Sequence, residues 1–361
     1  MESSPHILHL GWSESPHVVR WLAPLQERGY EVRLLSYGGG PVGGTPTVCV
    51  RRRALGKLGY ALALPEALRS ARVAPPDLIH AHYAAGFGLW GARMKKALGV
   101  PLVVSCLGTD IVQTAHTPVL GAVVRGALEA ADALIAPSRF LAEQIAALNA
   151  KFAAKTRVIY FGMDLTSTDA LCDDRQQSSG PVRVLFFKHH RAEYGPEVAL
   201  RAFALARQRR PHMTLTLGGR GPLTGSLKRL AGELNVVEGV TFPGYIQPEH
   251  ALGFIAEHDI LLMPTQVAES FGVAALEAAA VAVPTVGSNV GGIPEVVRDR
   301  QTGLLLDRSD TQGFADALVA LAEEPERRMA YGAAARAMVE REFDWKEKVD
   351  SLAALYRELL R

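Results

Sequence analysis

The chain has 361 residues, which exceeds the usual size of a single domain, so we expect two domains. Its apolar content of 48% supports sizeable cores and excludes general disorder. The sequence contains no apolar run of about 18 residues, which predicts no membrane span. The first residues lack the pattern of a signal peptide, and the three cysteines lack metal or disulfide spacing. These features favour a reduced, cytoplasmic setting.

Charge is divided unevenly along the chain. Residues 1–165 contain 17 Lys and Arg against 11 Asp and Glu, a net +6, and the remainder contains 22 against 26, a net −4. Basic residues crowd into one segment of the first half: Arg51, Arg52, Arg53, Lys57, Arg69, Arg72, Arg93, Lys95 and Lys96. Such a cluster suits peripheral contact with an anionic membrane, and a solvated basic face is the alternative. We expect no nucleic-acid partner.

Short apolar runs alternate with helical patterns throughout the first half. The predicted strands are 7–10, 31–36, 78–81, 102–106, 133–136 and 157–160, and the predicted helices are 17–28, 55–72, 87–98, 118–131 and 138–148. This alternation predicts a doubly wound parallel sheet. We assign residues 1–165 to an N-terminal domain.

A polar stretch then interrupts the pattern, and the alternation restarts after it. Residues 166–181 form the best linker candidate. The strands predicted beyond it are 182–187, 213–217, 240–242, 260–263, 283–286 and 303–306. Residues 182–343 therefore form a second α/β domain, and residues 344–361 form a C-terminal helix that can pack back on the first domain. Ligands of such sheets bind at the carboxyl ends of the strands.

The most informative stretch runs from Glu269 to Glu277. It follows a predicted strand and enters an Ala-rich helix, with Ser270 and Gly272 near the helix start. A helix N-terminus is an anion site, and ionised carboxylates accept strong hydrogen bonds from hydroxyl groups. Carboxylate, anion site and carboxylate in this order fit a nucleotide-sugar. An ordinary helix with two exposed Glu residues remains the alternative.

Two further loops of the second half could contact a diphosphate. Gly219 and Gly221 follow a strand and would let the backbone approach a phosphate closely, although a plain turn explains them too. Lys188 and Arg191 follow another strand and could stabilise a departing phosphate, although a solvated basic loop is the alternative. The sequence contains no Asp-x-Asp pair and no metal spacing of His or Cys, so we expect no metal.

In the first half, polar residues follow predicted strands at three places. His17 comes after the first strand, His82 after the strand 78–81, and Asp110 after the strand 102–106. We expect these side chains at the ligand-binding edge of the sheet. His80, within its strand, is expected to be a core histidine.

These residues form a series of motifs that resembles a known family. The second half contains, in order, Gly244-Tyr245, Asp259 through Pro264, Glu269-Ser270-Phe271-Gly272, Leu276-Glu277-Ala278, Pro284, Gly291-Gly292-Ile293-Pro294-Glu295 and Thr302-Gly303. This part resembles the retaining glycosyltransferases of the GT-B fold, family four (group 1). The first half is similar more loosely. The resemblance implies two Rossmann-like domains, with a nucleotide-sugar bound mainly by the C-terminal domain and an acceptor mainly by the N-terminal one.

The resemblance also implies roles for individual residues. Glu269 would contact donor-sugar hydroxyls at the reacting centre, Glu277 would hold the ribose, and the backbone of Phe271, Gly272 and Val273 would meet the diphosphate and sugar. Lys188, with Arg191 as the weaker match, would serve the leaving phosphate. Asp110 would be a third catalytic residue, and His17 and His82 would lie on the acceptor side.

Three features depart from the family's pattern. Many relatives carry Gly-Arg-x-x-x-x-Lys-Gly where this chain has residues 188–195, although Lys188 matches other relatives that place a Lys before a Tyr-Gly. Leu107 stands where relatives often have a histidine. Ala282 stands where a helix-ending glycine is expected, at a cost of about 1 kcal/mol if the left-handed backbone persists.

The expected reaction is metal-independent, cofactor-free transfer of a sugar, with retention, from a nucleotide-sugar to a glycan, lipid or small-molecule hydroxyl. A UDP-sugar is the default donor. A sugar-nucleotide epimerase and a catalytically inactive binding subunit remain the alternatives.

Overall fold

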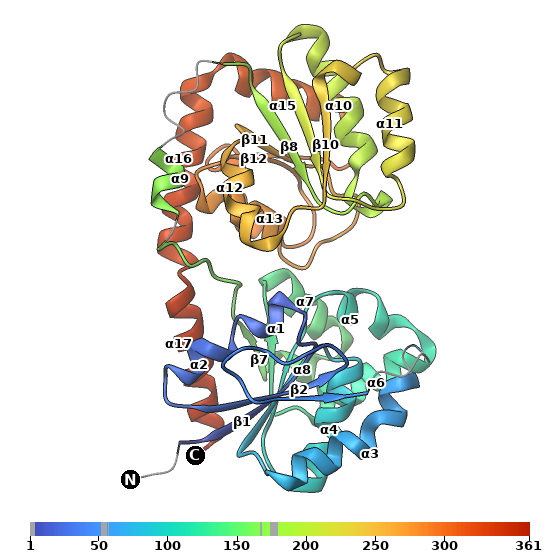
Figure 1. Ribbon diagram of the computed structural model, residues 1–361, viewed down its shortest axis with the longest axis vertical. Helices are drawn as coiled ribbons and strands as arrows, with labels where there is room; N and C mark the ends of the chain where they lie inside the picture. Colours follow the sequence, from blue (N-terminus) through green and yellow to red (C-terminus); the bar gives the residue numbers. More distant parts are fainter. Residues whose placement is uncertain (1–3, 52–55, 57, 167, 174–179) are drawn as a thin grey trace. The chain divides into compact units, whose positions relative to one another are not determined.

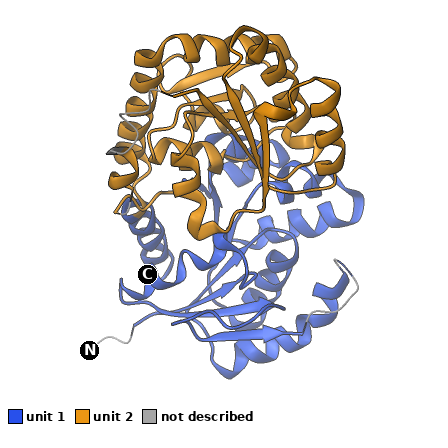
Figure 2. Cartoon of the chain, turned by 45° about the horizontal axis from the view of Figure 1, so that its top comes forward, with its two compact units in different colours: residues 1–160, 346–361 blue, residues 161–345 orange. Residues whose placement is uncertain are grey.

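The computed structural model describes residues 4–51, 56, 58–166, 168–173 and 180–361, and it divides into two compact units (Figures 1 and 2). Unit 1 comprises residues 1–160 and 346–361, and unit 2 comprises residues 161–345. The division therefore falls earlier than the linker that the sequence suggests. Arg336 explains why the described part of that linker stays with unit 2, because its guanidinium bonds Asp169 Oδ1 and the carbonyl of Ala280, both at 2.5 Å.

Unit 1 is built on a parallel sheet of seven strands in the order β3-β2-β1-β4-β5-β6-β7. The strands are β1 (His6–Leu10), β2 (Glu31–Tyr37), β3 (Thr47–Val50), β4 (Leu78–His82), β5 (Leu102–Ser105), β6 (Ala133–Ala136) and β7 (Thr156–Val158). The strand order reverses between β1 and β4, and ligands of open sheets bind at that switch point.

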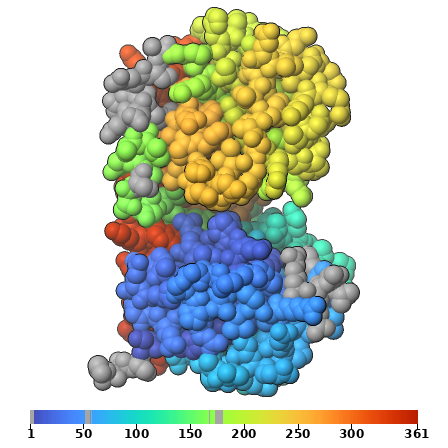
Figure 3. Space-filling view, in the orientation of Figure 1, coloured from blue at the N-terminus to red at the C-terminus, as the bar shows by residue number. Residues whose placement is uncertain are grey.

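Helices cover both faces of this sheet (Figure 1). They are α1 (Pro16–Val19), α2 (Leu22–Gln26), α3 (Leu58–Val73), α4 (Gly86–Leu98), α5 (Thr109–Val112), α6 (Pro118–Ala130), α7 (Arg139–Leu148), α8 (Ala150–Ala153) and the chain-end helix α17 (Trp345–Leu359). The space-filling view shows the surface of unit 1 on one side, formed mainly by the first hundred residues in blue (Figure 3).

The C-terminal helix α17 belongs to unit 1 by its contacts. The Tyr356 hydroxyl lies 2.5 Å from His80 Nδ1 in β4, and the Tyr30 hydroxyl donates to the carbonyl of Ala353 at 3.0 Å. Arg28 adds an ion pair with Asp350 at 2.6 Å. The last helix therefore joins the first unit of the chain.

Unit 2 contains a parallel sheet of six strands in the order β10-β9-β8-β11-β12-β13. The strands are β8 (Arg183–Phe187), β9 (Thr214–Gly218), β10 (Val240–Gly244), β11 (Ile260–Met263), β12 (Thr285–Ser288) and β13 (Gly303–Leu306). Its helices are α9 (Asp169–Asp173), α10 (Pro196–Arg209), α11 (Thr224–Glu233), α12 (Ala251–Ala256), α13 (Val273–Ala280), α14 (Ile293–Val296), α15 (Thr311–Glu323) and α16 (Pro325–Glu342). The switch point of this sheet lies between β8 and β11.

Both units thus have the doubly wound α/β architecture that the alternating pattern predicts. Within the described residues, every helix is too short or too polar to cross a membrane.

Candidate functional site

The strongest cluster of functional side chains lies at the switch point of unit 2. Lys188 directly follows β8, and Thr265 and Glu269 lie in the loop that follows β11. Because β8 and β11 are neighbouring parallel strands, their carboxyl ends meet at one edge of the sheet. This edge is where ligands of open α/β sheets bind.

Lys188 and Glu269 form an ion pair at this edge. Lys188 Nζ lies 3.1 Å from Glu269 Oε2, and their side chains are 24% and 10% exposed. The hydroxyl of Thr265 donates to the other carboxylate oxygen, Oε1, at 3.0 Å. The ammonium also lies 4.9 Å from the centre of the Tyr194 ring, within reach of a cation–π interaction. The carboxylate and the ammonium are thus both oriented by neighbouring side chains.

Helix α13 begins next to this pair, as the sequence predicts. Gly272 is its N-cap residue and has a φ of +110°, which a residue with a Cβ rarely adopts. The loop that carries Glu269 packs against two other glycines, Gly291 and Gly292. Gly292 N donates to the carbonyl of Glu269 at 2.8 Å, and a Cβ on Gly291 would lie 2.2 Å from that same oxygen. Glycine is therefore required where the two loops cross.

The glycines predicted for phosphate approach have a packing role in this structure. A Cβ on Gly219 would lie 2.1 Å from the carbonyl oxygen of Lys188, and one on Gly221 would lie 2.6 Å from that of His190. The loop after β9 therefore packs directly on the loop that carries Lys188. This close packing holds Lys188 at the carboxyl end of β8.

The remaining predicted donor-side residues are distributed around α13 and β8. Glu277 lies in the second turn of α13 and is half-buried, as are Ser270 and Val273 near the helix start. The Phe271 ring is buried and contacts Phe161 and Phe343 at 5.7 and 5.9 Å between ring centroids, so this side chain is part of the core. Arg191 forms an ion pair with Glu193 at 3.8 Å and its side chain is 58% exposed.

In unit 1, Asp110 is a buried carboxylate that orders two loops. It accepts hydrogen bonds from the backbone N–H groups of Ala84 at 2.9 Å, Gly108 at 2.8 Å and Ile111 at 3.2 Å. Burial raises the pKa of the Asp110 carboxyl, and the backbone N–H donors oppose that shift. Through these hydrogen bonds Asp110 positions the loops that follow β4 and β5.

The expectation that His82 follows its strand at the edge of the sheet is wrong, because His82 is the last residue of β4. Strand β4 continues through His82, which pairs with Ser105 in the sheet, and its side chain is completely buried. His82 Nε2 lies 3.0 Å from Nδ1 of His9. His17 lies in α1 and is half-buried.

His82 is part of a buried histidine cluster with His9 and His80, which sequence reasoning missed as a group. One nitrogen of each ring lies within 4.8 Å of the others, a spacing that could hold a metal ion. However, His80 already bonds Tyr356 through Nδ1 and Ser105 through Nε2, at 2.5 and 2.7 Å. His80 therefore joins α17 to the sheet. The alternation of His80 and His82 along one strand, facing His9 on a neighbour, is the signal that could have found it.

Thr265 and Tyr194 are the residues at the unit 2 site that sequence reasoning missed. Thr265 comes two residues after the end of β11, where parallel sheets place ligand-binding side chains, and this position is a usable signal. The contact of Tyr194 with Lys188 depends on the turn between β8 and α10 and has no comparable signal.

Comparisons with known proteins bear on both halves of the chain. Residues 172–338 match the family model described as Glycosyl transferases group 1, and residues 15–167 match that described as Glycosyltransferase Family 4. The chain is 32% identical over 289 residues to a D-inositol 3-phosphate glycosyltransferase of Arthrobacter sp., covering 75% of this chain and 68% of that protein. It is 28% identical over 292 residues to a glycogen synthase of Mycobacterium tuberculosis, covering 78% and 68%.

Solved structures show the same architecture over nearly the whole chain. Sucrose-phosphate synthase of Thermosynechococcus elongatus superposes with a TM-score of 0.82 at 21% identity, covering 98% of this chain and 99% of that one. HepE of Anabaena, in complex with UDP-glucose, superposes with a TM-score of 0.81 at 22% identity, covering 98% and 100%. At these identities the likeness establishes the fold, which is GT-B.

Proposed function

Because the chain belongs to the glycosyl transferases group 1 family and is a glycosyltransferase, we propose that it transfers a sugar from a UDP-sugar to an acceptor hydroxyl with retention at the anomeric carbon. The complex of HepE with UDP-glucose supports this choice of donor. The observation that carries the proposal is the Lys188–Glu269 ion pair at 3.1 Å, beside the start of α13 at the sheet's switch point.

Each part of this site has a place in the proposed reaction. The first N–H groups of a helix lack partners within the helix and carry positive dipole, so the start of α13 suits a diphosphate. Lys188 supplies the cation that a leaving phosphate needs. Glu269, with its carboxylate oriented by Lys188 and Thr265, accepts hydrogen bonds from sugar hydroxyls.

In the proposed step, the acceptor oxygen forms a bond to the anomeric carbon on the face from which the phosphate departs. The bond between that carbon and the phosphate oxygen breaks, and its electron pair leaves with the nucleoside diphosphate. The leaving phosphate takes the proton of the acceptor hydroxyl. Lys188 and the helix start balance its charge, and we propose that no metal ion takes part.

A nucleotide-release assay tests the proposal. Protein with UDP-glucose and a glycan or lipid extract should release UDP at a rate that excess EDTA leaves unchanged. Lys188→Met should lower kcat by about 10²-fold, as losing one preorganised stabilising group does. Lys151→Met, on the exposed surface of α8, is the matched control and should leave kcat unchanged.

Three results would count against the proposal. A donor that is converted to its epimer without net release of UDP would favour the epimerase alternative. Loss of activity in EDTA that magnesium or manganese restores would contradict metal independence. If neither UDP, GDP nor ADP raises the Tm of the protein, donor binding itself is absent, because a ligand of the folded state must stabilise it.

A further inference from the structure

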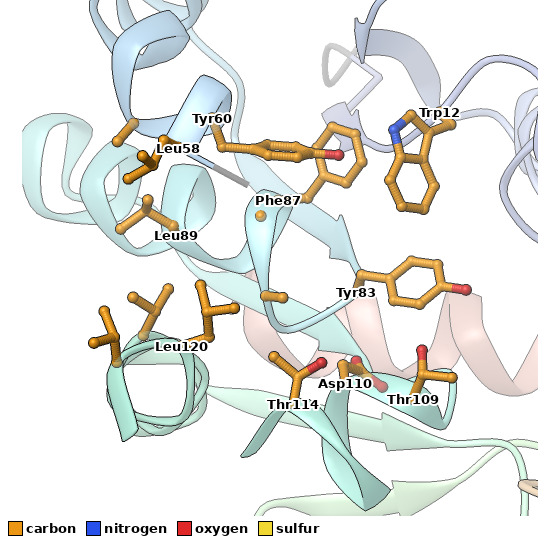
Figure 4. Close-up of a pocket in the computed structure, with 15 residues that line it drawn as sticks. Trp12, Leu58, Tyr60, Tyr83, Phe87, Leu89, Thr109, Asp110, Thr114 and Leu120 are labelled. Carbon is orange, nitrogen blue, oxygen red and sulfur yellow. The ribbon is translucent and has the colours of Figure 1, made fainter. Parts of the chain in front are cut away.

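Unit 1 contains a pocket of about 440 Å³ at the edge of its sheet (Figure 4). Its volume lies within the range of sites for small molecules, roughly 300–1,000 Å³. Fifteen residues line it, and most of them are aromatic or aliphatic.

The pocket lies at the switch point of the unit 1 sheet. Trp12 follows β1, Tyr83 directly follows β4, and Thr109 begins α5 after β5. This position within unit 1 corresponds to that of Lys188 and Glu269 within unit 2. A cavity there meets the general rule for ligand sites in open α/β sheets.

The lining has a polar end and an apolar body. Thr109, Asp110 and Thr114 gather at one end, whereas Leu58, Leu89 and Leu120 lie toward the other (Figure 4). The aromatic wall is packed through edge contacts of Trp12, whose ring centroid lies 5.1 Å from that of Tyr83 and 5.4 Å from that of Phe87. Such a lining suits a molecule with a hydroxyl at one end and a hydrocarbon body.

The backbone at Tyr83 has a strained conformation, and this conformation sets the position of the Tyr83 ring in the aromatic wall. Its φ is +76°, an unfavourable value for a residue with a bulky side chain. The conformation is held by hydrogen bonds from Tyr83 N to the carbonyl of Ser105 and from Gly88 N to the carbonyl of Tyr83, both at 2.9 Å. Strain of this kind persists where the surroundings over-determine it, and it is concentrated at ligand sites.

Apolar side chains continue from the pocket to its mouth. Leu58 of α3 and Val119 of α6 both line it, and they are 72% and 77% exposed. Leaving such side chains in water forgoes the free energy of burial, roughly 25 cal/mol per Å² of apolar surface. A hydrocarbon group on the ligand would cover them.

We propose that this pocket binds the apolar part of the acceptor, so that the acceptor is a hydroxyl compound with a hydrocarbon body, either an alkyl or isoprenoid chain or a fused ring system. This inference rests on the proposed function, since it assigns the second substrate of that reaction. Hydrocarbon in the pocket places the acceptor hydroxyl at the end formed by Thr109, Asp110 and Thr114.

Calorimetric titration with three glucosides tests the inference. The probes share one sugar and differ in the aglycone: methyl, n-octyl and 2-naphthyl β-D-glucopyranoside, each below its micelle concentration. The octyl or naphthyl compound should bind at least tenfold more tightly than the methyl compound. Preference for octyl indicates a chain acceptor, and preference for naphthyl indicates a ring acceptor.

Matched variants locate the binding. Val119→Asp puts a charge at the pocket mouth and should weaken binding of the preferred glucoside about fivefold. Val73→Asp makes the same change at the end of α3, outside the pocket, where the side chain is 80% exposed, and should have no effect. Equal affinity for all three glucosides, or equal effects of the two variants, would overturn the inference.

The thermal shift with UDP, measured on the same samples, separates this inference from the proposed function. A UDP shift without aglycone preference removes the pocket inference alone. Aglycone binding without any nucleotide shift removes the transferase proposal and leaves an apolar binding site.

Discussion

Glu269 and Glu277 belong to one strand–loop–helix segment but have different surroundings, and this difference predicts different kinetic roles. Glu269 lies against Lys188, where the bond to the sugar would break. Glu269→Gln removes the charge while keeping the shape, and we expect it to lower kcat by about 10²-fold or more, because interactions stronger in the transition state appear in kcat. Glu277→Gln should mainly raise KM for the donor, because the ribose is unchanged during the reaction.

Steady-state kinetics of both variants with varied donor decide between the two roles. The reverse pattern, in which Glu277→Gln loses kcat and Glu269→Gln loses donor affinity, would mean that the nucleotide lies in the opposite direction along α13.

Ala282 is a second residue whose geometry yields a prediction. It follows the end of α13 with a φ of +55°, so the left-handed backbone expected for a glycine at this position persists. Val283 N bonds the carbonyl of Ala278 at 2.8 Å, which closes the helix end. Ala282→Gly should stabilise unit 2 by about 1 kcal/mol and raise its Tm by about 2–4 °C.

The control is Ala334→Gly, at an exposed position inside α16, which should instead lower the stability of unit 2 by about 1 kcal/mol. Thermal unfolding of both variants checks this; a lower Tm for Ala282→Gly would contradict it.

For individual residues, the sequence predicted positions correctly where they depend only on the neighbouring strand pattern. Lys188 and Glu269 follow predicted strands, which places both at the ligand-binding edge of the sheet. Their contact depends in addition on β8 and β11 being neighbours, which the sequence pattern does not specify. The buried state of Asp110 and His82 depends on which loops and helices cover them, and on one extra residue of β4. Sequence patterns locate the ends of strands poorly. For this reason the His82 ring, expected at the edge of the sheet, lies in the core.

At the scale of elements, prediction succeeded best for buried parallel strands. The runs 133–136 and 260–263 have the predicted bounds, because every residue of these two strands is apolar and buried. The edge strand 303–306 also has the predicted bounds, although three of its four residues are half-buried. Strand β3 was missed because three of its four residues are partly or fully exposed at the sheet edge. The helix expected over 17–28 is two short helices, α1 and α2.

The contact between β1, β4 and α17 predicts acid sensitivity of unit 1. Burial lowers the pKa of His9 to about 3 and lowers those of His80 and His82 well below the usual value. The folded state therefore keeps these rings neutral while the unfolded chain binds protons below about pH 6.5. Their contribution to stability is full above that pH and is lost as the pH falls toward the folded-state pKa values, by up to about 1.4 kcal/mol per ring per pH unit.

Urea unfolding between pH 7.5 and 4.5 measures this slope. His82→Gln removes one ring and should flatten the dependence of unfolding free energy on pH. His116→Gln, which changes an exposed histidine of the same unit, is the control and should leave the slope as it is. An unchanged slope in His82→Gln would show that the buried rings do not carry the acid sensitivity.

At the scale of the whole molecule, the sequence predicted two α/β units but drew their boundary inside unit 2. Composition marks a polar segment as a linker, whereas the structure ties its described part to unit 2 through the ion pair of Asp169 with Arg336 of α16, which is far away in the sequence. Contacts of this kind leave no local signal. The membership of α17 in unit 1 depends in the same way on Tyr30, Tyr356 and Asp350, which are polar or amphipathic residues with many other possible roles.

The charge difference between the two halves leads to a final prediction, that unit 1 binds anionic membranes. Of the basic cluster, Arg52, Arg53 and Lys57 lie outside the described residues, and Lys95 is paired with Asp132 at 2.5 Å. The others, Arg51, Arg69, Arg72, Arg93 and Lys96, are exposed. Anionic lipid attracts such residues with about 1 kcal/mol each near the surface, screened by salt.

Sedimentation with liposomes containing phosphatidylserine tests this attraction. The protein should pellet with them at low salt and be released at high salt, and it should stay in solution with neutral liposomes. Reversing two charges in α3, Arg69→Glu with Arg72→Glu, should abolish pelleting. Reversing two in α11 of unit 2, Lys228→Glu with Arg229→Glu, changes the net charge equally and should leave pelleting intact, since both residues are exposed outside the cluster. Equal loss of pelleting in the two double variants would mean that the net charge of the protein, and not the cluster on unit 1, drives the attraction. If the unaltered protein fails to pellet at low salt, the basic cluster is a solvated face and does not bind membranes.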